Sequence, residues 1–136
     1  MSESSKHAEL VGIIVEYIRR EHTHTTAMGI LDDLTGPLRA ERPSKIGGFV
    51  PDVHAFDAPL TTVIIGEAKT AADLETEHSL NQIKAFMLYL SHQRAGIFIL
   101  AVPWQVKRRG SSLIEAVRKD IGAHSVRTIT LDDVGC

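Results

Sequence analysis

The sequence PDVHAFDAPLTTVIIGEAK, residues 51–69, decides the fold because it predicts two adjoining β-strands. Its second half, residues 61–69, is rich in threonine, valine and isoleucine, which favour strands. Residues 45–56 alternate well enough between apolar and polar positions to form another strand. The DAPL segment between them, residues 57–60, has the composition of a turn. Three charged side chains therefore fall near the ends of two neighbouring strands.

Asp52, Glu67 and Lys69 are expected to share one face of this strand pair. A four-residue hairpin loop at DAPL would place Asp52 opposite Ile65. Because side chains alternate along a strand, Glu67 and Lys69 would then project on the same side as Asp52. Asp52 and Glu67 become diagonal neighbours, with Cα atoms roughly 7–8 Å apart. This expectation depends on the register, since one further loop residue would turn Asp52 to the other face.

Two carboxylates at this spacing are typical of a site for a hard divalent cation. Acids this close repel each other unless a cation lies between them. Mg²⁺ prefers oxygen ligands and keeps several waters, so Asp52 and Glu67 would suffice, with the Ala68 carbonyl as a further oxygen. The metal would lower the pKa of a bound water and offset charge developing on a phosphate. Lys69 would hold that water or stabilise the extra negative charge, which points to phosphodiester hydrolysis.

The rest of the chain predicts a mixed sheet flanked by helices, an α/β layer arrangement. Helices are expected over residues 4–21, 73–91 and 111–121, the last with a serine cap. Further strands are expected over residues 28–34, 96–102 and 126–131. The nearly all-apolar strand 96–102 would be buried on both faces. Gly47-Gly48 would mark a bulge or a close approach of the backbone.

Length and composition describe one globular domain, residues 1–136, with room for a sizeable core. The formal net charge of −2 means that a local patch would have to bind any nucleic acid. Cys136 is the single cysteine, so an internal disulfide is excluded and a reducing compartment is expected. The apolar run of residues 10–15 is too short to cross a membrane. We expect a cytoplasmic protein.

Pro51-Asp52 followed by Glu67-Ala68-Lys69 resembles the signature of the PD-(D/E)xK nuclease superfamily. That superfamily includes type II restriction enzymes, Holliday-junction resolvases and RecB-like nuclease domains. The resemblance covers roughly the whole chain and implies a restriction-endonuclease-like αβββαβ core, with a central mixed sheet between helices. It also implies Mg²⁺-dependent cleavage of nucleic acid, with Mn²⁺ as a substitute. Asp52 and Glu67 would be the metal ligands and Lys69 the catalytic lysine.

The same resemblance implies two further site residues. Many members add a glutamate from the first helix, and Glu9 is preferred to Glu16 here because it directly precedes the apolar run. RecB-like members carry a glutamine on the helix after the lysine strand, where Gln82 falls. Their tyrosine four residues later is replaced by Phe86 here, which leaves the branch open.

These side chains also have plain structural interpretations. Asp52 could be a strand-end turn residue, and Glu67 and Lys69 could form an exposed cross-strand ion pair. His54 shares the predicted face of Asp52, so it could assist the metal or contact phosphate, or be a surface histidine. Basic residues could straddle a nucleic-acid backbone or simply be solvated; they are Arg39, Arg42, Lys45 and the run Lys107 to Arg109.

The sequence therefore predicts a small Mg²⁺-dependent nuclease that acts on DNA rather than RNA. A chain this short has little room for a separate recognition domain, so we expect it to read the structure of its substrate, as a junction or flap nuclease does. A homodimer would present two sites to two strands. The alternative is a non-catalytic nucleic-acid-binding or assembly protein with the same fold and a relic site.

Overall fold

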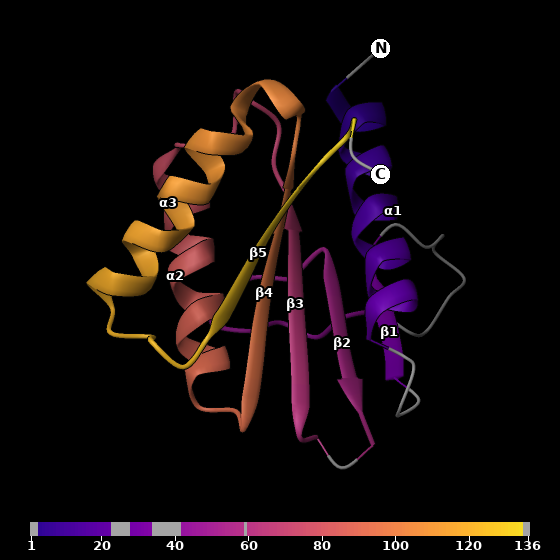
Figure 1. The fold of residues 1–136 in the computed structure, drawn as a ribbon, viewed down its shortest axis with the longest axis vertical. Coiled ribbons are helices and arrows are strands. Elements are labelled where there is room, and N and C mark those ends of the chain that lie inside the picture. The colour runs from indigo at the N-terminus through magenta and orange to yellow at the C-terminus, as the bar shows by residue number, and fades with distance from the viewer. Residues whose placement is uncertain (1–2, 23–27, 34–41, 59, 135–136) are drawn as a thin grey trace.

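In the part of the chain that the structure describes, three α-helices pack against a five-stranded sheet (Figure 1). This computed structural model describes residues 3–22, 28–33, 42–58 and 60–134. The strands are β1 (Met28–Asp32), β2 (Val53–Asp57), β3 (Thr62–Ala68), β4 (Ala95–Val102) and β5 (Arg127–Asp132). The helices are α1 (Glu3–Glu21), α2 (Glu77–Ser91) and α3 (Lys107–Asp120), with a short 3-10 helix η1 (Trp104–Val106) before α3. The fold is α/β, as the sequence predicts.

The sheet is mixed, and its strands lie side by side in chain order from β1 to β5. β1, β2 and β3 pair antiparallel, whereas β3, β4 and β5 pair parallel. α2 joins β3 to β4 and α3 joins β4 to β5, because parallel neighbours need a long crossover connection. The carboxyl ends of β3, β4 and β5 therefore meet at one end of the sheet, where residues that follow these strands come together.

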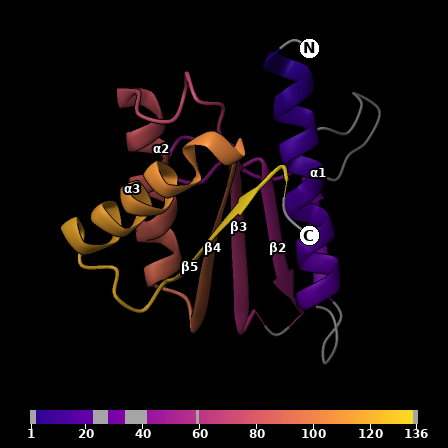
Figure 2. The ribbon, with the colours of Figure 1, turned by 45° about the horizontal axis from the view of Figure 1, so that its top comes forward.

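The helices form two layers, with α1 on one face of the sheet and α2 and α3 on the other (Figure 2). Alternation along β3 serves both layers: Val63 and Ile65 belong to the core beneath α2 and α3. Ile64 instead packs in the core beneath α1, together with Ile14 of that helix. Every residue of β4 after Ala95 is buried, which confirms the strand predicted to be covered on both faces.

The predicted register between β2 and β3 is wrong by two residues. Val53 lies opposite Gly66 and His54 opposite Ile65, so Asp52 comes beside Glu67 rather than opposite Ile65. A shift of two residues keeps the alternation of faces, whereas a shift of one would have reversed it. The two acids are consequently closer neighbours than the sequence predicts.

The side chain of Asp57 closes the turn between these two strands. Its Oδ1 accepts from the backbone N–H of Thr61 at 2.7 Å and of Thr62 at 3.2 Å, and its Oδ2 accepts from the Thr61 hydroxyl. Leu60 adds a backbone hydrogen bond to the Asp57 carbonyl at 2.9 Å and has a positive φ of 57°. The connection between Asp57 and Thr62 is still four residues long, but it begins one residue later than the predicted DAPL loop, and this accounts for the two-residue change in register.

Three element boundaries also differ from prediction. The strand expected over residues 45–56 shrinks to β2, because residues 46–49 form a tight turn in which both glycines have positive φ, +61° and +88°. A Cβ on Gly47 would lie 2.8 Å from the Ala85 Cβ, so the predicted close backbone approach is confirmed. α2 begins at Glu77 rather than residue 73, and α3 begins at Lys107 without the predicted serine cap.

No helix in the described part of the chain has the length and apolar character that crossing a membrane requires.

Candidate active site

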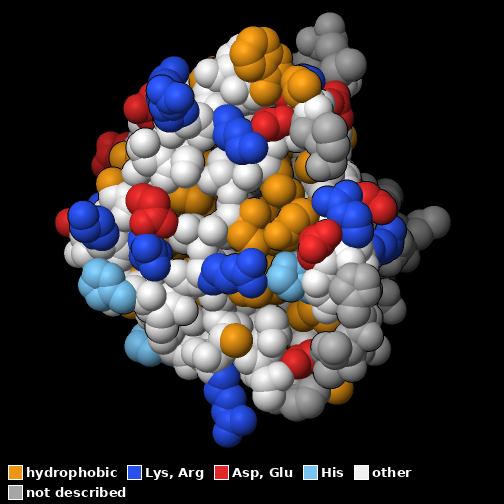
Figure 3. All heavy atoms as spheres, in the orientation of Figure 1, with side chains coloured by type: hydrophobic (Ala, Val, Ile, Leu, Met, Phe, Trp, Pro, Cys, Tyr) orange, Lys and Arg blue, Asp and Glu red, His pale blue; other side chains and the backbone are white. Residues whose placement is uncertain are grey.

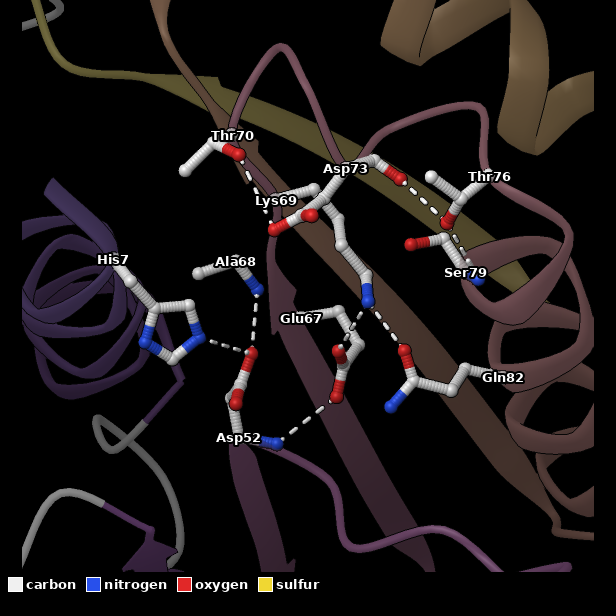
Figure 4. A network of polar contacts seen from close by, with 10 residues as sticks. All are labelled: His7, Asp52, Glu67, Ala68, Lys69, Thr70, Asp73, Thr76, Ser79 and Gln82. Carbon is white, nitrogen blue, oxygen red and sulfur yellow. Dashed lines mark hydrogen bonds and ion pairs between the residues drawn. The ribbon is translucent and has the colours of Figure 1, made fainter. Parts of the chain in front are cut away.

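A pocket of about 460 Å³ opens beside the carboxyl end of β3 (Figure 4). α1 contributes His7 from one side, and α2 contributes Gln82 from the other. The floor comes from Asp52, just before β2, and from the end of β3. Its lining comprises His7, Asp52, Glu67, Ala68, Lys69, Asp73, Thr76, His78, Ser79 and Gln82. Predicted site residues separated by up to thirty positions in the chain thus line one pocket.

Asp52 is held by two donors from different parts of the chain. Its Oδ2 accepts from the Ala68 backbone N–H at 2.9 Å and lies 3.2 Å from His7 Nε2. The hydrogen bond to Asp52 raises the pKa of His7, since it favours the imidazolium. The carboxylate therefore turns toward α1, whereas the sequence predicted that it would share the face of Glu67 and Lys69.

His7 also lines the pocket, although the sequence did not indicate it. It lies three, four and seven residues before the buried Leu10, Val11 and Ile14, so it continues the stripe of α1 that faces the sheet. A histidine in an otherwise apolar helix face was the feature of the sequence that could have indicated a role for His7. Its partner is 45 residues away in the chain, so no local pattern could identify the contact.

Glu67 is the buried carboxylate of the site, with only 2% of its surface exposed. Its Oε1 accepts from the Asp52 backbone N–H at 3.0 Å, and its Oε2 lies 3.5 Å from Lys69 Nζ. Burial raises the pKa of Glu67 well above its usual range, and the negative charge of Asp52 raises it further. The positive charge of Lys69 lowers it, but not enough to reverse these two effects.

Lys69 is nearly as buried, at 7% exposure, and its ammonium group donates to Gln82 Oε1. Its backbone N–H donates to the Ala101 carbonyl at 3.0 Å, which continues the pairing of β3 with β4. The stem is thus fixed by the sheet and the charged end by α2. The structure brings Glu67, Lys69 and Gln82 together as the sequence predicts, and it excludes an exposed ion pair between the first two.

The connection after Lys69 orients the start of α2. The Thr70 hydroxyl donates to Asp73 Oδ2 at 3.2 Å, and the Thr76 hydroxyl donates to the Asp73 carbonyl at 3.0 Å. Thr76 Oγ1 in turn accepts from the Ser79 N–H at 3.1 Å and caps the helix. This chain of bonds fixes the first turn of α2 and, one turn later, the position of Gln82.

Other candidates lie outside this pocket. Glu9 forms a partly exposed ion pair with Lys6 at 3.3 Å, and Glu16 lines a different pocket between α1 and β5. The expected first-helix glutamate is therefore not brought to the site, and His7 stands there instead. His54 packs edge-on against Phe56 and Tyr89, and burial lowers its pKa. Arg39, one of the basic residues that could straddle a nucleic-acid backbone, lies outside the described residues.

Few oxygen atoms in the pocket could serve as metal ligands. Among the described residues, no group of three or more histidine, cysteine, aspartate or glutamate side chains has the arrangement of a metal site. Asp52 and Glu67 supply carboxylates, and the Ala68 carbonyl points the same way as its N–H, toward Asp52. Such a set resembles the sparse protein ligation of Mg²⁺, which keeps several waters.

We compared the chain with family models, curated protein sequences and solved structures, and none of them matches it.

Proposed function

We propose that the protein is an Mg²⁺-dependent nuclease that hydrolyses phosphodiester bonds of DNA. The observation that carries this proposal is a buried glutamate beside a second carboxylate and a buried lysine, all lining an open pocket at the end of a strand. Burial and the charge of Asp52 raise the pKa of Glu67, and Lys69 lowers it. Perturbed acids in a cleft are the usual mark of a functional site.

The order of elements supports the same proposal. From α1 to β4 the chain runs helix, three strands, helix, strand, with an antiparallel hairpin followed by a parallel crossover. This agrees with the αβββαβ core of the PD-(D/E)xK superfamily, which the motif already resembles. We therefore propose a restriction-endonuclease-like core, in which Asp52 and Glu67–Lys69 occupy the positions of the two half-motifs.

The residues fit a divalent cation. Asp52, Glu67 and the Ala68 carbonyl would hold it. Burial is the main reason that the pKa of Glu67 is raised, and a positive ion would favour the charged carboxylate and offset the added repulsion from Asp52. When bound, Mg²⁺ or Mn²⁺ would supply a water of lowered pKa and neutralise charge on the phosphate. His7 keeps Asp52 Oδ2 oriented, as hydrogen-bonded partners of metal ligands commonly do.

Lys69 is the side chain that would meet the reacting groups. Gln82 accepts from its ammonium as a neutral amide, so the lysine is positioned without a second full negative charge. In the pocket that ammonium would orient the attacking water or stabilise the developing negative charge of the phosphate. We further propose that the enzyme reads substrate structure and acts as a homodimer.

Cleavage assays test the proposal directly. The parent protein is incubated with a four-way junction, a flapped duplex and a linear duplex in Mg²⁺, Mn²⁺ or EDTA. We expect metal-dependent cleavage that falls by about 100-fold or more in Asp52→Asn and in Lys69→Ala. Glu9→Gln, which removes a charge from the exposed part of α1, is the matched control and should cleave like the parent.

Retained circular dichroism would show that the variants fold. Equal cleavage by parent and Asp52→Asn would exclude this active site. Metal-independent DNA binding with no cleavage of any substrate would instead favour the non-catalytic nucleic-acid-binding protein with a relic site. Equilibrium sedimentation tests the dimer separately.

A further inference from the structure

A second groove, of about 550 Å³, lies where β4 passes into α3, and an exposed tryptophan marks it. Trp104 is 54% exposed, although an indole is among the largest apolar side chains. Lys107 and Arg108 of α3 line the same groove, along with two serines of α3 and two threonines of β5. Figure 3 shows exposed hydrophobic side chains above the start of α3, with lysine and arginine side chains nearby. No acidic side chain is among the described residues that line it.

The backbone beneath the exposed ring is fixed. The Trp104 N–H donates to Asp133 Oδ1 at 2.9 Å, and Asp133 Oδ2 pairs with Lys6 of α1 at 2.9 Å. The turn of η1 is closed by the Val106 N–H on the Pro103 carbonyl at 3.0 Å. The indole is thus presented to solvent by an anchored turn, as a stacking platform requires.

The cations of the groove are available to a ligand. Arg108 forms no ion pair or hydrogen bond within the described part of the chain. Lys107 pairs with Asp132 at 3.1 Å, but half of its side chain is exposed, so screening makes that pair weak. Hydroxyl groups, cations and one aromatic face suit a phosphate backbone that carries an unstacked base.

The groove opens at the same end of the sheet as the candidate active site. Ala68 of β3 lies beside Ala101 of β4, and Trp104 follows three residues later. A third hollow, of about 430 Å³, shares Arg108 with the groove and is also lined by Glu75, which forms an ion pair with Arg109. Glu75 directly precedes Thr76, which lines the active-site pocket. Through this hollow, the groove at Trp104 reaches the segment that leads into the active-site pocket.

From this geometry we infer that the groove binds a single-stranded segment of nucleic acid, with Trp104 stacked on a base and Lys107 and Arg108 on phosphates. The inference rests on the proposed function and narrows its substrate class to DNA with an unpaired tail or flap. Stacking on an indole tolerates every base, so the groove selects strandedness rather than sequence.

Intrinsic fluorescence tests this binding without any cleavage, because the chain contains a single tryptophan. The parent protein is titrated in EDTA with a short oligothymidylate, with a duplex of equal phosphate content, and with polyglutamate. We expect saturable quenching by the oligothymidylate that weakens as salt increases, and little quenching by the other two. Equal quenching by the duplex, or by polyglutamate, would overturn the inference, as would no quenching by the oligothymidylate.

Variants locate the site through the anisotropy of a labelled oligothymidylate. Trp104→Ala should weaken binding about tenfold, and Trp104→Phe should keep much of the affinity. Arg108→Ala should weaken binding and reduce its salt dependence. Arg94 is an exposed arginine just before the first residue of β4, at the other end of that strand, so Arg94→Ala should bind like the parent. Equal losses in the two arginine variants would contradict a local groove.

The two proposals fail separately. If the oligothymidylate quenches the fluorescence but no substrate is cleaved, the groove proposal stands and the nuclease proposal is excluded. Metal-dependent cleavage that is unaffected by Asp52→Asn would exclude the proposed active site and leave the groove proposal standing. Cleavage without quenching would remove the groove alone.

Discussion

At the level of single residues, the neutral amide of Gln82 positions the Lys69 ammonium without adding a negative charge beside it. The ammonium donates to a neutral amide, and the nearest carboxylate oxygen, on Glu67, is 3.5 Å away. An aspartate or glutamate at position 82 would have paired the lysine fully. In the proposed function, the neutral amide would leave the positive charge of Lys69 free to act on a ligand in the pocket.

Loss of Gln82 should impair turnover more than folding. In Gln82→Ala the Lys69 ammonium loses its acceptor, so we expect kcat to fall by about 10- to 100-fold with little change in KM. The melting temperature should change little, because Gln82 is only partly buried. Asn81→Ala, an exposed neighbour on α2, serves as the control. A fall in stability large enough to unfold the protein would contradict a positioning role.

At the level of elements, the turn after β2 determines whether the site can form. Asp57 accepts three hydrogen bonds from Thr61 and Thr62, and these bonds set the register that brings Asp52 beside Glu67. The hydrogen bonds from Thr61 and Thr62 lower the pKa of the Asp57 carboxyl from its usual value of 3.8. The site thus depends on a side chain that lies at the far end of the strands.

The contribution of Asp57 to stability should depend on pH. A carboxyl whose pKa is lower in the folded protein stabilises it above the unfolded pKa, and loses that effect as pH falls through the folded pKa. Asp57→Asn should therefore be less stable than the parent by a constant amount above about pH 5, and the difference should shrink below about pH 4. Urea unfolding between pH 3 and pH 7 measures this. A difference that stays constant to pH 3 would contradict it.

Contact between α1 and the sheet depends on the absence of a side chain at Gly66. A Cβ there would lie 2.6 Å from Ile14 Cγ2 and 3.4 Å from the Val53 Cβ. Gly66→Ala should destabilise the protein by about 1–3 kcal/mol and move His7 away from Asp52. Gly12→Ala is the matched control, since its Cβ would meet nothing within 4 Å; it should stabilise α1 by up to about 1 kcal/mol. Urea denaturation gives both values, and equal effects would refute the packing argument.

At the scale of the whole molecule, one sheet shares its faces between two cores. β3 contributes Val63 and Ile65 to the core under α2 and α3, and Ile64 to the core under α1. If either helix layer detached from the sheet, it would expose the apolar side chains of the central strands. Unfolding should therefore be a single cooperative transition. The candidate site lies where the two layers meet, between His7 and Gln82.

A bound metal should therefore stabilise the entire fold. A ligand that binds only the native state adds about 2.7 kcal/mol at 100 times its dissociation constant. We expect Mn²⁺ to raise the melting temperature by several degrees in the parent and in Glu9→Gln, but not in Asp52→Asn. Differential scanning calorimetry in chelated and metal-containing buffer measures the shift. An equal shift in Asp52→Asn would place the metal elsewhere.

Much of the site could be predicted from sequence because its residues sit at the ends of strongly patterned elements. Alternation places Glu67 and Lys69 on one side of β3, and a helix after that strand returns Gln82 to them. His7 and Trp104 could not be predicted in the same way. The first is identified by a partner 45 positions away, and the second by the side chains of α3 and β5 around it.

The sequence by itself determined the α/β class, the buried strand β4 and the placement of four side chains in one pocket, because hydrophobic periodicity is a local property. These side chains are Asp52, Glu67, Lys69 and Gln82. Only the tertiary structure decided the register of β2 against β3, the start of α3 at Lys107 and the contact of His7 with Asp52. Each of these depends on side chains that meet through space. The hydrogen bonds of Asp57 fix where the turn begins, and the sheet determines which face of α1 packs against it.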